Sequence, residues 1–396
     1  MGAIAPGLGP IVCVVGARPN FMKMAPLLAA FGRNPGLPRA VLVHTGQHYD
    51  AALNDQLFVG LGLPQPDLNL EVGSASHAAQ TAEIMRRFEP VLDRYEPCAV
   101  IVVGDVNSTL ACSLVAVKRS VPVAHVEAGL RSFDRSMPEE INRLLTDQIA
   151  ELLYTTERSA AVNLAREGIP PERIAFVGNV MIDSLRAHLP RAVPPAETLR
   201  RAGVVLPSSP RRGGAERRGG AFGLVTLHRP ANVDHPEALL ESLELLRAVS
   251  ERLPLVCPLH PRTRQSIERF GLESLLATPR LAILPPQGYL ETLGLMANAA
   301  VVLTDSGGIQ EETTALGVPC LTMRDTTERP ITVDEGTNTV IGRDRELALR
   351  LVGEILAGGG KRGRTPALWD GRAAERIAEH LAGWLARRHA HVGARA

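Results

Sequence analysis

The sequence predicts an α/β protein with parallel sheets, and three observations support this fold class. Short apolar runs recur along the chain, separated by stretches long enough for amphipathic helices. The runs are apolar throughout instead of alternating with polar residues, which is typical of strands that helices cover on both faces. Nearly every run ends in polar or glycine-rich sequence, as parallel strands do beside a ligand site. The length of 396 residues favours more than one such domain.

The expected strands form two groups. In the first half of the chain they are Ile11–Val15, Ala40–Val43, Ala99–Val103, Val121–Val126, Glu151–Tyr154 and Ile174–Val177. In the second half they are Phe222–Leu227, Leu253–Cys257, Leu281–Leu284, Ala300–Leu303 and Val318–Met323. The segment 207–220 between them has four arginines and no apolar periodicity, so we expect an exposed loop at or near a domain junction.

The helices between the strands begin at recognisable signals. Asn107 or Ser108 is expected to cap the helix after the third strand, because short polar side chains favour that position. Pro138 fits the first turn of a later helix. A last amphipathic helix, Asp370–Arg388, follows a glycine-rich break and is expected to fold back onto the first domain.

Composition limits the function classes. The net charge of +1 gives no electrostatic case for binding nucleic acid or an anionic membrane. No apolar run approaches the roughly 20 residues of a membrane-spanning helix. The N-terminus, 1–10, lacks the basic region of a signal peptide. We therefore expect a cytoplasmic protein.

The cysteines indicate neither a metal site nor disulfides. Their number, five, is odd, and no two stand in a C-x-x-C arrangement. Cys13, Cys257 and Cys320 fall in or beside expected strands, so they are interpreted as small buried hydrophobes. Cys98 and Cys112 are also interpreted as structural.

The segment Thr304–Glu312 is the most informative stretch of the chain. It follows an apolar strand and precedes a helical pattern, an arrangement that points free backbone N–H groups at an anion. Gly307 and Gly308 allow a phosphate to approach the main chain, and Ser306 can add a hydroxyl donor. Glu311 and Glu312, one turn later, could accept hydrogen bonds from a ribose. The pattern suits a nucleotide diphosphate, although such a turn often has no ligand.

Charged side chains also follow the strands of the first half. Arg18 and Lys23 stand near a probable helix N-terminus, where the helix dipole disfavours cations, and this suggests a bound anion. Asp105 is either a turn residue or an acid/base group. Glu127 has no capping role to fill and is interpreted as functional. Glu139 follows Pro138 in a first helical turn, where the dipole favours a carboxylate without any function.

In the second half, His228 ends a strand beside Arg229, which suits phosphate binding, whereas His260 is equally compatible with a packed core position. The polar strand ends of both halves together predict a cleft between two α/β units. The first β–α turn, Gly16–Asn20, is not a G-x-G-x-x-G fingerprint, so no dinucleotide site is expected there.

Taken together, these motifs resemble the non-hydrolysing UDP-N-acetylglucosamine 2-epimerases. They occur in family order from Ile11 to about Ile341, and they are specific in combination. The motifs are Gly16–Pro26, Gly104-Asp105, His125–Arg131, Pro138–Arg143, Thr226–Arg229, Asp305–Glu312 and Met323–Pro330.

The resemblance implies a GT-B architecture with two Rossmann-like domains, 1–190 and 200–369, and a C-terminal helix, 370–391, that packs on the first. It implies an active site between them and a homodimer. It also implies interconversion of UDP-N-acetylglucosamine and UDP-N-acetylmannosamine without NAD, metal or another cofactor.

The same resemblance assigns roles to individual residues. Asp105, Glu127 and Glu139 match the proton-transfer carboxylates, and His228 matches the histidine near the diphosphate. The matching substrate-binding positions are Arg18, Lys23, Gln287, Ser306, Gly307, Gly308, Glu312 and Arg329. The sequence departs from the family at Asn20, at Pro230–Asn232 and in the long arginine- and glycine-rich insertion.

The implied chemistry expels UDP while a base removes the C2 hydrogen, and then reverses both steps with the proton delivered to the other face. It needs a base, an acid and neutralisation of the departing diphosphate. Two alternatives remain: a hydrolysing 2-epimerase that releases UDP and N-acetylmannosamine, and a retaining GT-B glycosyltransferase. A more decorated UDP-sugar is also possible as substrate. The sequence does not reveal the pathway or whether the substrate activates allosterically, for which Gln47 and His260 are the candidates.

Overall fold

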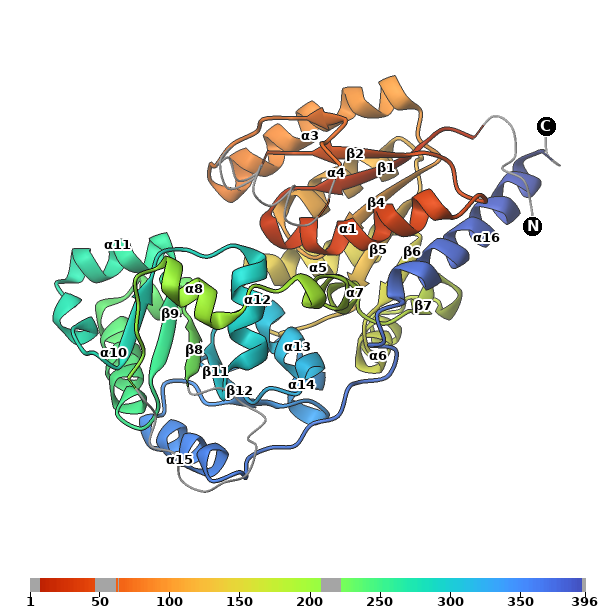
Figure 1. The fold of residues 1–396 in the computed structure, drawn as a ribbon. Coiled ribbons are helices and arrows are strands. Elements are labelled where there is room, and N and C mark those ends of the chain that lie inside the picture. The colour runs from red at the N-terminus through yellow and green to blue at the C-terminus, as the bar shows by residue number, and fades with distance from the viewer. Residues whose placement is uncertain (1–7, 47–61, 63, 208–221, 394–396) are drawn as a thin grey trace. The chain divides into compact units, whose positions relative to one another are not determined.

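The computed structural model describes residues 8–46, 62, 64–207 and 222–393. The chain divides into two compact units: residues 1–187 with 367–396, and residues 188–366. Each unit contains one parallel sheet with helices packed on it (Figure 1). No described helix combines the length and apolar character needed to cross a membrane.

The sheet of the first unit has the order β3-β2-β1-β4-β5-β6-β7, and every described pairing is parallel. Its strands are β1 Ile11–Val15, β2 Ala40–His44, β3 Leu68–Asn69, β4 Ala99–Val103, β5 Val123–Ala128, β6 Leu152–Thr155 and β7 Ile174–Phe176. Its helices are α1 Arg18–Arg33, α3 His77–Tyr95, α4 Asn107–Lys118, α5 Pro138–Ile149, α6 Arg158–Arg166, α7 Val180–His188 and α16 Ala373–Gly393.

The sheet of the second unit has the order β10-β9-β8-β11-β12-β13, again parallel. Its strands are β8 Gly223–Thr226, β9 Leu255–Pro258, β10 Leu281–Leu284, β11 Val301–Thr304, β12 Cys320–Thr322 and β13 Asn338–Val340. Its helices are α8 Pro195–Arg201, α9 Pro230–Val233, α10 Pro236–Ser250, α11 Pro261–Phe270, α12 Tyr289–Asn298, α13 Gly307–Leu316, α14 Pro330–Asp334 and α15 Arg345–Leu356.

The expected α/β class with parallel sheets is confirmed, and the expected apolar runs are strands with small shifts at their ends. The fourth begins at Val123 and extends to Ala128. The last helix begins at Ala373 rather than at Asp370. The expected cap of α4 was wrong: the N-cap is Val106, and Asn107 is already helical.

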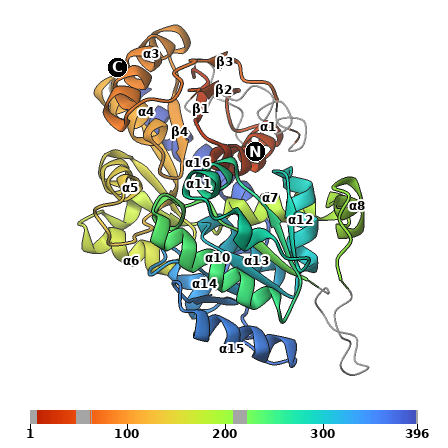
Figure 2. The ribbon, with the colours of Figure 1, turned by 90° about the vertical axis from the view of Figure 1, so that its left-hand side faces the viewer.

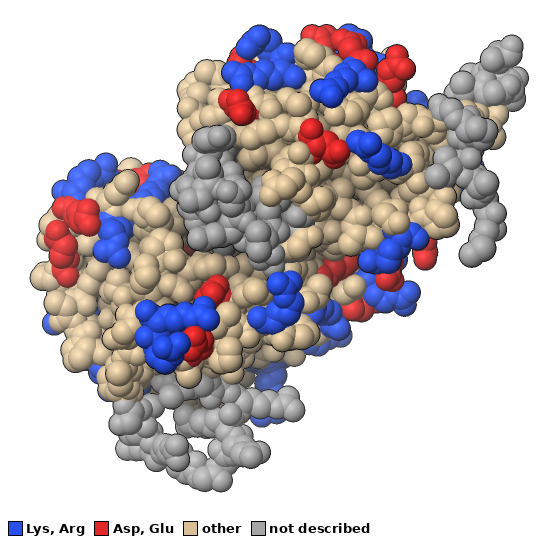
Figure 3. All heavy atoms as spheres, turned by 45° about the horizontal axis from the view of Figure 1, so that its top comes forward, with Lys and Arg blue, Asp and Glu red and all other residues tan. Residues whose placement is uncertain are grey.

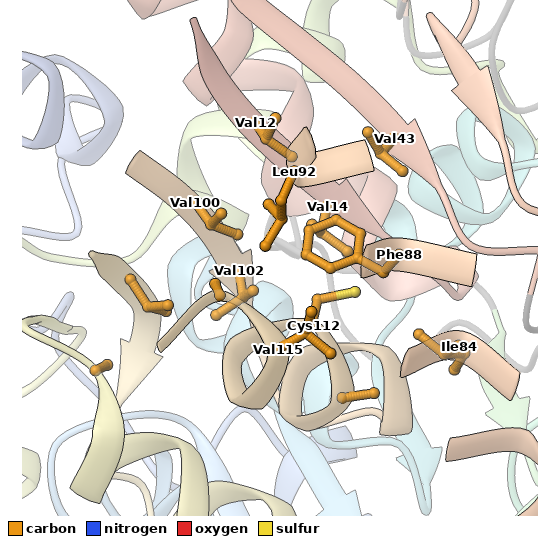
Figure 4. Packing of buried hydrophobic residues seen from close by; sticks show 14 of the residues in the cluster. Val12, Val14, Val43, Ile84, Phe88, Leu92, Val100, Val102, Cys112 and Val115 are labelled. Atoms are coloured by element: carbon orange, nitrogen blue, oxygen red, sulfur yellow. The ribbon is translucent and has the colours of Figure 1, made fainter. Parts of the chain in front are cut away.

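The core of the first unit explains why its strands are apolar on both faces. Phe88 and Leu92 of α3 and Cys112 of α4 lie against Val12 and Val100 of the sheet (Figure 4). Figure 2 shows α3 and α4 side by side on this unit, in agreement with their close packing. Burying a large apolar side chain such as Phe88 or Leu92 contributes about 1.5–3 kcal/mol. The helices on this face therefore contribute substantially to the stability of the sheet.

The other face of this sheet is covered by helices that include the last one. Helix α16 packs along α1, and the two run side by side in Figure 1. Trp369, just before α16, is buried and donates its indole N–H to the carbonyl of Thr156 at 3.0 Å. Asp183 accepts the backbone N–H groups of Ala373 and Ala374, so α7 holds the start of α16. The C-terminal helix is thus part of the first unit.

Both sheets reverse their strand order at one point. In the first unit the order changes between β1 and β4, and in the second between β8 and β11. At such a point, the helices that follow two neighbouring strands lie on opposite faces of the sheet. A crevice forms there at the carboxyl ends of the strands, and α/β proteins bind ligands in it. The structure therefore directs attention to the residues after β1, β4, β8 and β11.

Candidate functional site

At the first switch point, where the strand order reverses between β1 and β4, the side chain of Asn20 forms hydrogen bonds to the ends of both strands. Its side-chain oxygen accepts the backbone N–H groups of Gly16 and Ala17 at 3.1 and 3.0 Å. Its amide nitrogen donates to the carbonyl of Val103 at 3.0 Å. This departure from the family pattern is therefore a buried asparagine that holds the turn after β1.

Asp105 follows β4 at the same switch point. Its carboxylate forms an ion pair with the guanidinium of Arg143, a buried residue of α5. The Asp105 side chain remains 24 % exposed, so it can still meet a ligand. The backbone carbonyl of Asp105 also accepts a hydrogen bond from Asn142 at 2.9 Å. These contacts fix a partly open carboxylate and place a full positive charge beside it.

Glu127 lies within β5, where the strand bulges. Its φ is +73°, and the pairing of β5 with β6 shifts register between Val126 and Ala128. A non-glycine residue in the left-handed region costs on the order of 1–3 kcal/mol, and such strain concentrates at functional sites. The bulge changes the direction in which the Glu127 side chain leaves the strand.

Lys23 is the cation that faces Glu127. Its ammonium lies 2.6 Å from the Glu127 carboxylate, and the two side chains are only 6 % and 2 % exposed. A methyl group added to Gly104 would lie 3.1 Å from the same nitrogen, which places Lys23 beside the turn that carries Asp105. Lys23 was expected to hold the nucleotide sugar; the described contacts of its ammonium are with Glu127 and with the turn at Gly104.

The two glutamates at the start of α5 differ in their surroundings. Glu140 is buried, pairs with Arg143 at 2.6 Å, and accepts the backbone N–H groups of Ser132 and Phe133. Burial, the largest influence, acts to raise the pKa of Glu140, but the Arg143 guanidinium and the two N–H donors hold it below its usual value. Glu139 is half-buried, and its carboxylate makes no hydrogen bond or ion pair with another described residue. Glu140 is thus a structural anchor, and Glu139 is the available carboxylate.

At the second switch point, Asp305 organises the turn after β8. Its buried carboxylate accepts the backbone N–H groups of His228 and Arg229 and lies 3.2 Å from Nδ1 of His228. Burial, the largest influence, acts to raise the pKa of Asp305, but the His228 ring and these N–H groups hold it below its usual value. Asn232 donates to the same carboxylate at 3.3 Å, which gives this second departure from the family a role. With Nδ1 facing Asp305, the His228 side chain remains 36 % exposed.

The expected phosphate cradle is the N-terminus of α13. Ser306 is its N-cap and makes no capping hydrogen bond through its side chain. Gly307 and Gly308 form the first turn, where backbone N–H groups have no partner within the helix. A methyl group on Gly307 would lie 2.5 Å from Oε1 of Glu328, so a larger residue would have to displace that side chain. This terminus has the features of an anion site.

The two glutamates of α13 have different partners. Glu312 accepts a hydrogen bond from the hydroxyl of Tyr289 at 2.8 Å. Glu311 instead pairs with Arg329 at 2.9 Å, and both side chains are buried. Of the two carboxylates, Glu312 is the better candidate for a ribose. The described ion pair of Arg329 is with Glu311 of the same unit. Its expected role, binding the nucleotide through its positive charge, stays a prediction.

Sequence reasoning missed the buried glutamate beside this helix. Glu328 lies 2.8 Å from Arg324 and 4.0 Å from Arg229. Burial alone would raise its pKa, but the neighbouring guanidinium groups lower it to about 2. Glu328 therefore lies beside the first turn of α13 with several guanidinium groups near its carboxylate. Arg324 and Arg329, on either side of Glu328 in the sequence, were the available signal.

The remaining candidates are less constrained. The amide of Gln287 donates to the carbonyl of Pro285 at 2.9 Å in its own loop. Arg18 begins α1, but its side chain lies outside the described residues, as do Gln47 and the segment 208–220. His260 caps α11 by accepting the N–H of Arg262, and its ring lies 5.5 Å from that of His228. Among the described residues, no cluster of His, Cys, Asp and Glu could hold a metal ion.

Comparison with known proteins identifies the family. A family model described as UDP-N-acetylglucosamine 2-epimerase matches residues 33–382. The chain belongs to the UDP-N-acetylglucosamine 2-epimerase family. The UDP-N-acetylglucosamine 2-epimerase of Methanococcus maripaludis is 39 % identical over 346 residues, which cover 87 % of this chain and 90 % of that protein.

A second relative has a different substrate in its name. The UDP-2,3-diacetamido-2,3-dideoxy-D-glucuronate 2-epimerase of Pseudomonas aeruginosa is 38 % identical over 379 residues, covering 94 % of this chain and 99 % of the relative. The family therefore includes 2-epimerases of more than one UDP-sugar. The present chain is an enzyme of this UDP-sugar 2-epimerase family.

Solved structures give the same result. The UDP-GlcNAc 2-epimerase of Methanocaldococcus jannaschii, in complex with UDP-GlcNAc and UDP, matches with a TM-score of 0.80 and 37 % identity, covering 94 % of this chain and 99 % of that one. The Neisseria meningitidis enzyme bound to UDP-GlcNAc matches with a TM-score of 0.80 and 26 % identity over 94 % and 99 % of the two chains. The GT-B fold expected from the sequence is confirmed.

Proposed function

We propose that the protein interconverts UDP-N-acetylglucosamine and UDP-N-acetylmannosamine by eliminating and re-adding UDP, without hydrolysis. The observation that carries this proposal is the arrangement at the first switch point. Glu127 and Asp105 each carry a cation on the carboxylate, Lys23 and Arg143 respectively. A cation beside a carboxylate favours its ionised form, the state that a base must have before it removes a proton.

The forward reaction breaks two bonds of the sugar nucleotide. A carboxylate takes the proton from C2, the C2–H electrons form a C1=C2 double bond, and the C1–oxygen bond breaks to release UDP. The reverse step re-forms the C1–oxygen bond and adds a proton to the opposite face of C2. Asp105 and Glu127 are proposed as two of the proton-transfer groups. Glu139, which has no described cation beside it, is suited to carry the proton that a general acid supplies.

The second switch point is suited to the departing diphosphate. The first turn of α13, with Ser306, Gly307 and Gly308, offers backbone N–H groups to phosphate oxygens. Because Nδ1 of His228 faces Asp305, the ring can also donate from Nε2 to a phosphate oxygen only in its doubly protonated form. Glu312, held by Tyr289, is proposed to bind the ribose, and Gln287 to lie toward the uracil. Arg18, Lys23 and Arg329 complete the proposed substrate-binding set.

One comparison supports an alternative substrate. The relative named for UDP-2,3-diacetamido-2,3-dideoxy-D-glucuronate is 38 % identical over 94 % of the chain, nearly the same as the relative named for UDP-N-acetylglucosamine. The elimination chemistry would be the same, because C2 and the anomeric diphosphate are common to both sugars. Separate incubations with the two nucleotide sugars, followed by chromatography and NMR of the products, decide between them.

The decisive experiment follows the C2 hydrogen. Incubation with UDP-N-acetylglucosamine in heavy water, without NAD, should give UDP-N-acetylmannosamine with deuterium at C2. Release of free N-acetylmannosamine as the sole product would indicate the hydrolysing reaction instead. Epimerisation that keeps the original C2 hydrogen would contradict the elimination mechanism.

A further inference from the structure

A buried charge cluster lies behind the two proposed proton-transfer groups and takes no part in the mechanism above. Asp147 of α5 is its centre and is fully buried. Its carboxylate lies 2.6 Å from Nδ1 of His125 and 2.7 Å from a guanidinium nitrogen of Arg131. Arg131 also pairs with Glu167 at 2.6 Å. Two cations and two carboxylates thus balance one another within the first unit.

The His125 ring is bonded at both nitrogens. Nδ1 faces the Asp147 carboxylate, and Nε2 lies 2.7 Å from the backbone carbonyl of Gly104. A carboxylate and a carbonyl are both acceptors, so each nitrogen must carry a proton. Burial, the largest influence, raises the pKa of Asp147, yet His125 and Arg131 together hold it below its usual value, so Asp147 is ionised. The geometry therefore requires a cationic imidazole in a site without solvent.

The backbone groups held by this cluster flank the proposed catalytic residues. Gly104, whose carbonyl His125 binds, immediately precedes Asp105 and has a φ of +67°. The second carboxylate oxygen of Asp147 accepts the backbone N–H of Gly129 at 3.0 Å, two residues beyond the strained Glu127. One carboxylate is thus connected to both turns, through His125 on one side and directly on the other.

We propose that Asp147 and His125 are positioning residues that set the separation of Asp105 and Glu127 without touching the substrate. The proposal rests on the function proposed above for those two carboxylates. Displacing a catalytic group by about 1 Å can lower a rate about 100-fold, which is the scale expected if either turn relaxes. The nucleotide-binding groups lie on other elements and should keep their affinity for UDP.

The cluster provides a matched control. Glu167 pairs with Arg131 from α6's C-terminal end, but its described bonds reach neither Gly104 nor Gly129. Asp147→Asn and His125→Gln should lower kcat about 100-fold, and they should lower C2 deuterium exchange equally, while the UDP Kd changes less than threefold. Glu167→Gln should leave kcat within about threefold of the natural enzyme. A parallel loss of UDP affinity and kcat in the two test variants, or an equal effect of Glu167→Gln, would show that the cluster only supports folding.

A spectroscopic measurement tests the cluster independently of activity. In full-length protein labelled with ¹⁵N-histidine, one ring should show two protonated nitrogens, and His125→Gln should remove that signal. A neutral His125 ring would overturn the proposal even if the variants were inactive. If the natural enzyme epimerises neither UDP-sugar while this signal is present, the proposed function is wrong. The doubly protonated His125 would still be confirmed in that case.

Discussion

Replacing Lys23 with methionine removes the cation beside Glu127 while keeping much of the buried side-chain volume. The two side chains are 6 % and 2 % exposed, so water cannot substitute for the lost ammonium. Removing one partner of a buried pair typically costs about 3–5 kcal/mol. The carboxylate can limit that cost by taking up a proton. For an ordinary glutamate this costs about 1.4 kcal/mol per pH unit above about pH 4.3, hence about 4 kcal/mol at pH 7 and about 1 kcal/mol at pH 5.

The destabilisation by Lys23→Met should therefore depend on pH. Without Lys23 the folded state binds a proton at Glu127 more readily than the unfolded chain does, so the free energy of unfolding falls as the pH rises. The loss relative to the natural protein should grow from about 1 kcal/mol at pH 5 to about 4 kcal/mol at pH 7. Urea unfolding followed by circular dichroism at several pH values measures it.

Two controls isolate the buried pair. In the double variant Lys23→Met, Glu127→Gln the fall in stability with rising pH should vanish, because neither titratable group of the buried pair remains. Arg350→Met, which breaks an exposed pair with Glu354, should change stability little at any pH. A pH-independent loss in Lys23→Met alone would refute the reasoning and reduce the effect to packing.

Three further predictions concern other contacts. Glu139→Gln should lower kcat by about 10²–10⁴ without destabilising the fold, whereas Glu140→Gln should mainly lower the free energy of unfolding; the reverse pattern would exchange their roles. Tyr289→Phe removes the hydrogen bond to Glu312 and should weaken UDP binding about tenfold by calorimetry, and unchanged affinity would argue against Glu312 as the ribose ligand. Burial raises the pKa of Asp183 to about 6, so this group makes the free energy of unfolding fall by up to about 3 kcal/mol from pH 4 to pH 7. Asp183→Asn should remove that slope in urea titrations, and an identical slope would contradict it.

The surface offers less to predict. On the face drawn in Figure 3, the described acidic and basic side chains occur in small groups of both signs. This agrees with the net charge of +1. A surface without one dominant sign gives no reason to expect electrostatic attraction of a polyanion.

How much the sequence could predict depended on whether the signal was local. Apolar runs such as Ile11–Val15 predicted strands because each is buried on both faces. Leu68–Asn69 and Asn338–Val340 were missed because such short edge strands have too few residues for a pattern. Asp105 and Glu127 were found because a strand end is visible in the sequence.

Their partners were not found, because those contacts depend on tertiary structure. Arg143 reaches Asp105 across 38 positions, and Asp305 reaches His228 across 77. The left-handed backbone of Glu127 was equally invisible, since glutamate has no preference for that region. The sequence could thus place candidate groups at strand ends, but it could not identify the charged side chains that pair with them.

The backbone conformation of Glu127 also limits how this protein can be made more stable. Glycine adopts a φ of +73° without steric cost, and asparagine tolerates it better than glutamate does. Either replacement would relax the strand but would remove the carboxylate that faces Lys23. A search for thermostable variants that scores stability alone should therefore select changes at residue 127 that abolish turnover. Stabilising substitutions that keep activity should therefore be sought at positions where the residue that best fits the backbone conformation is not required to differ from the one that the reaction needs.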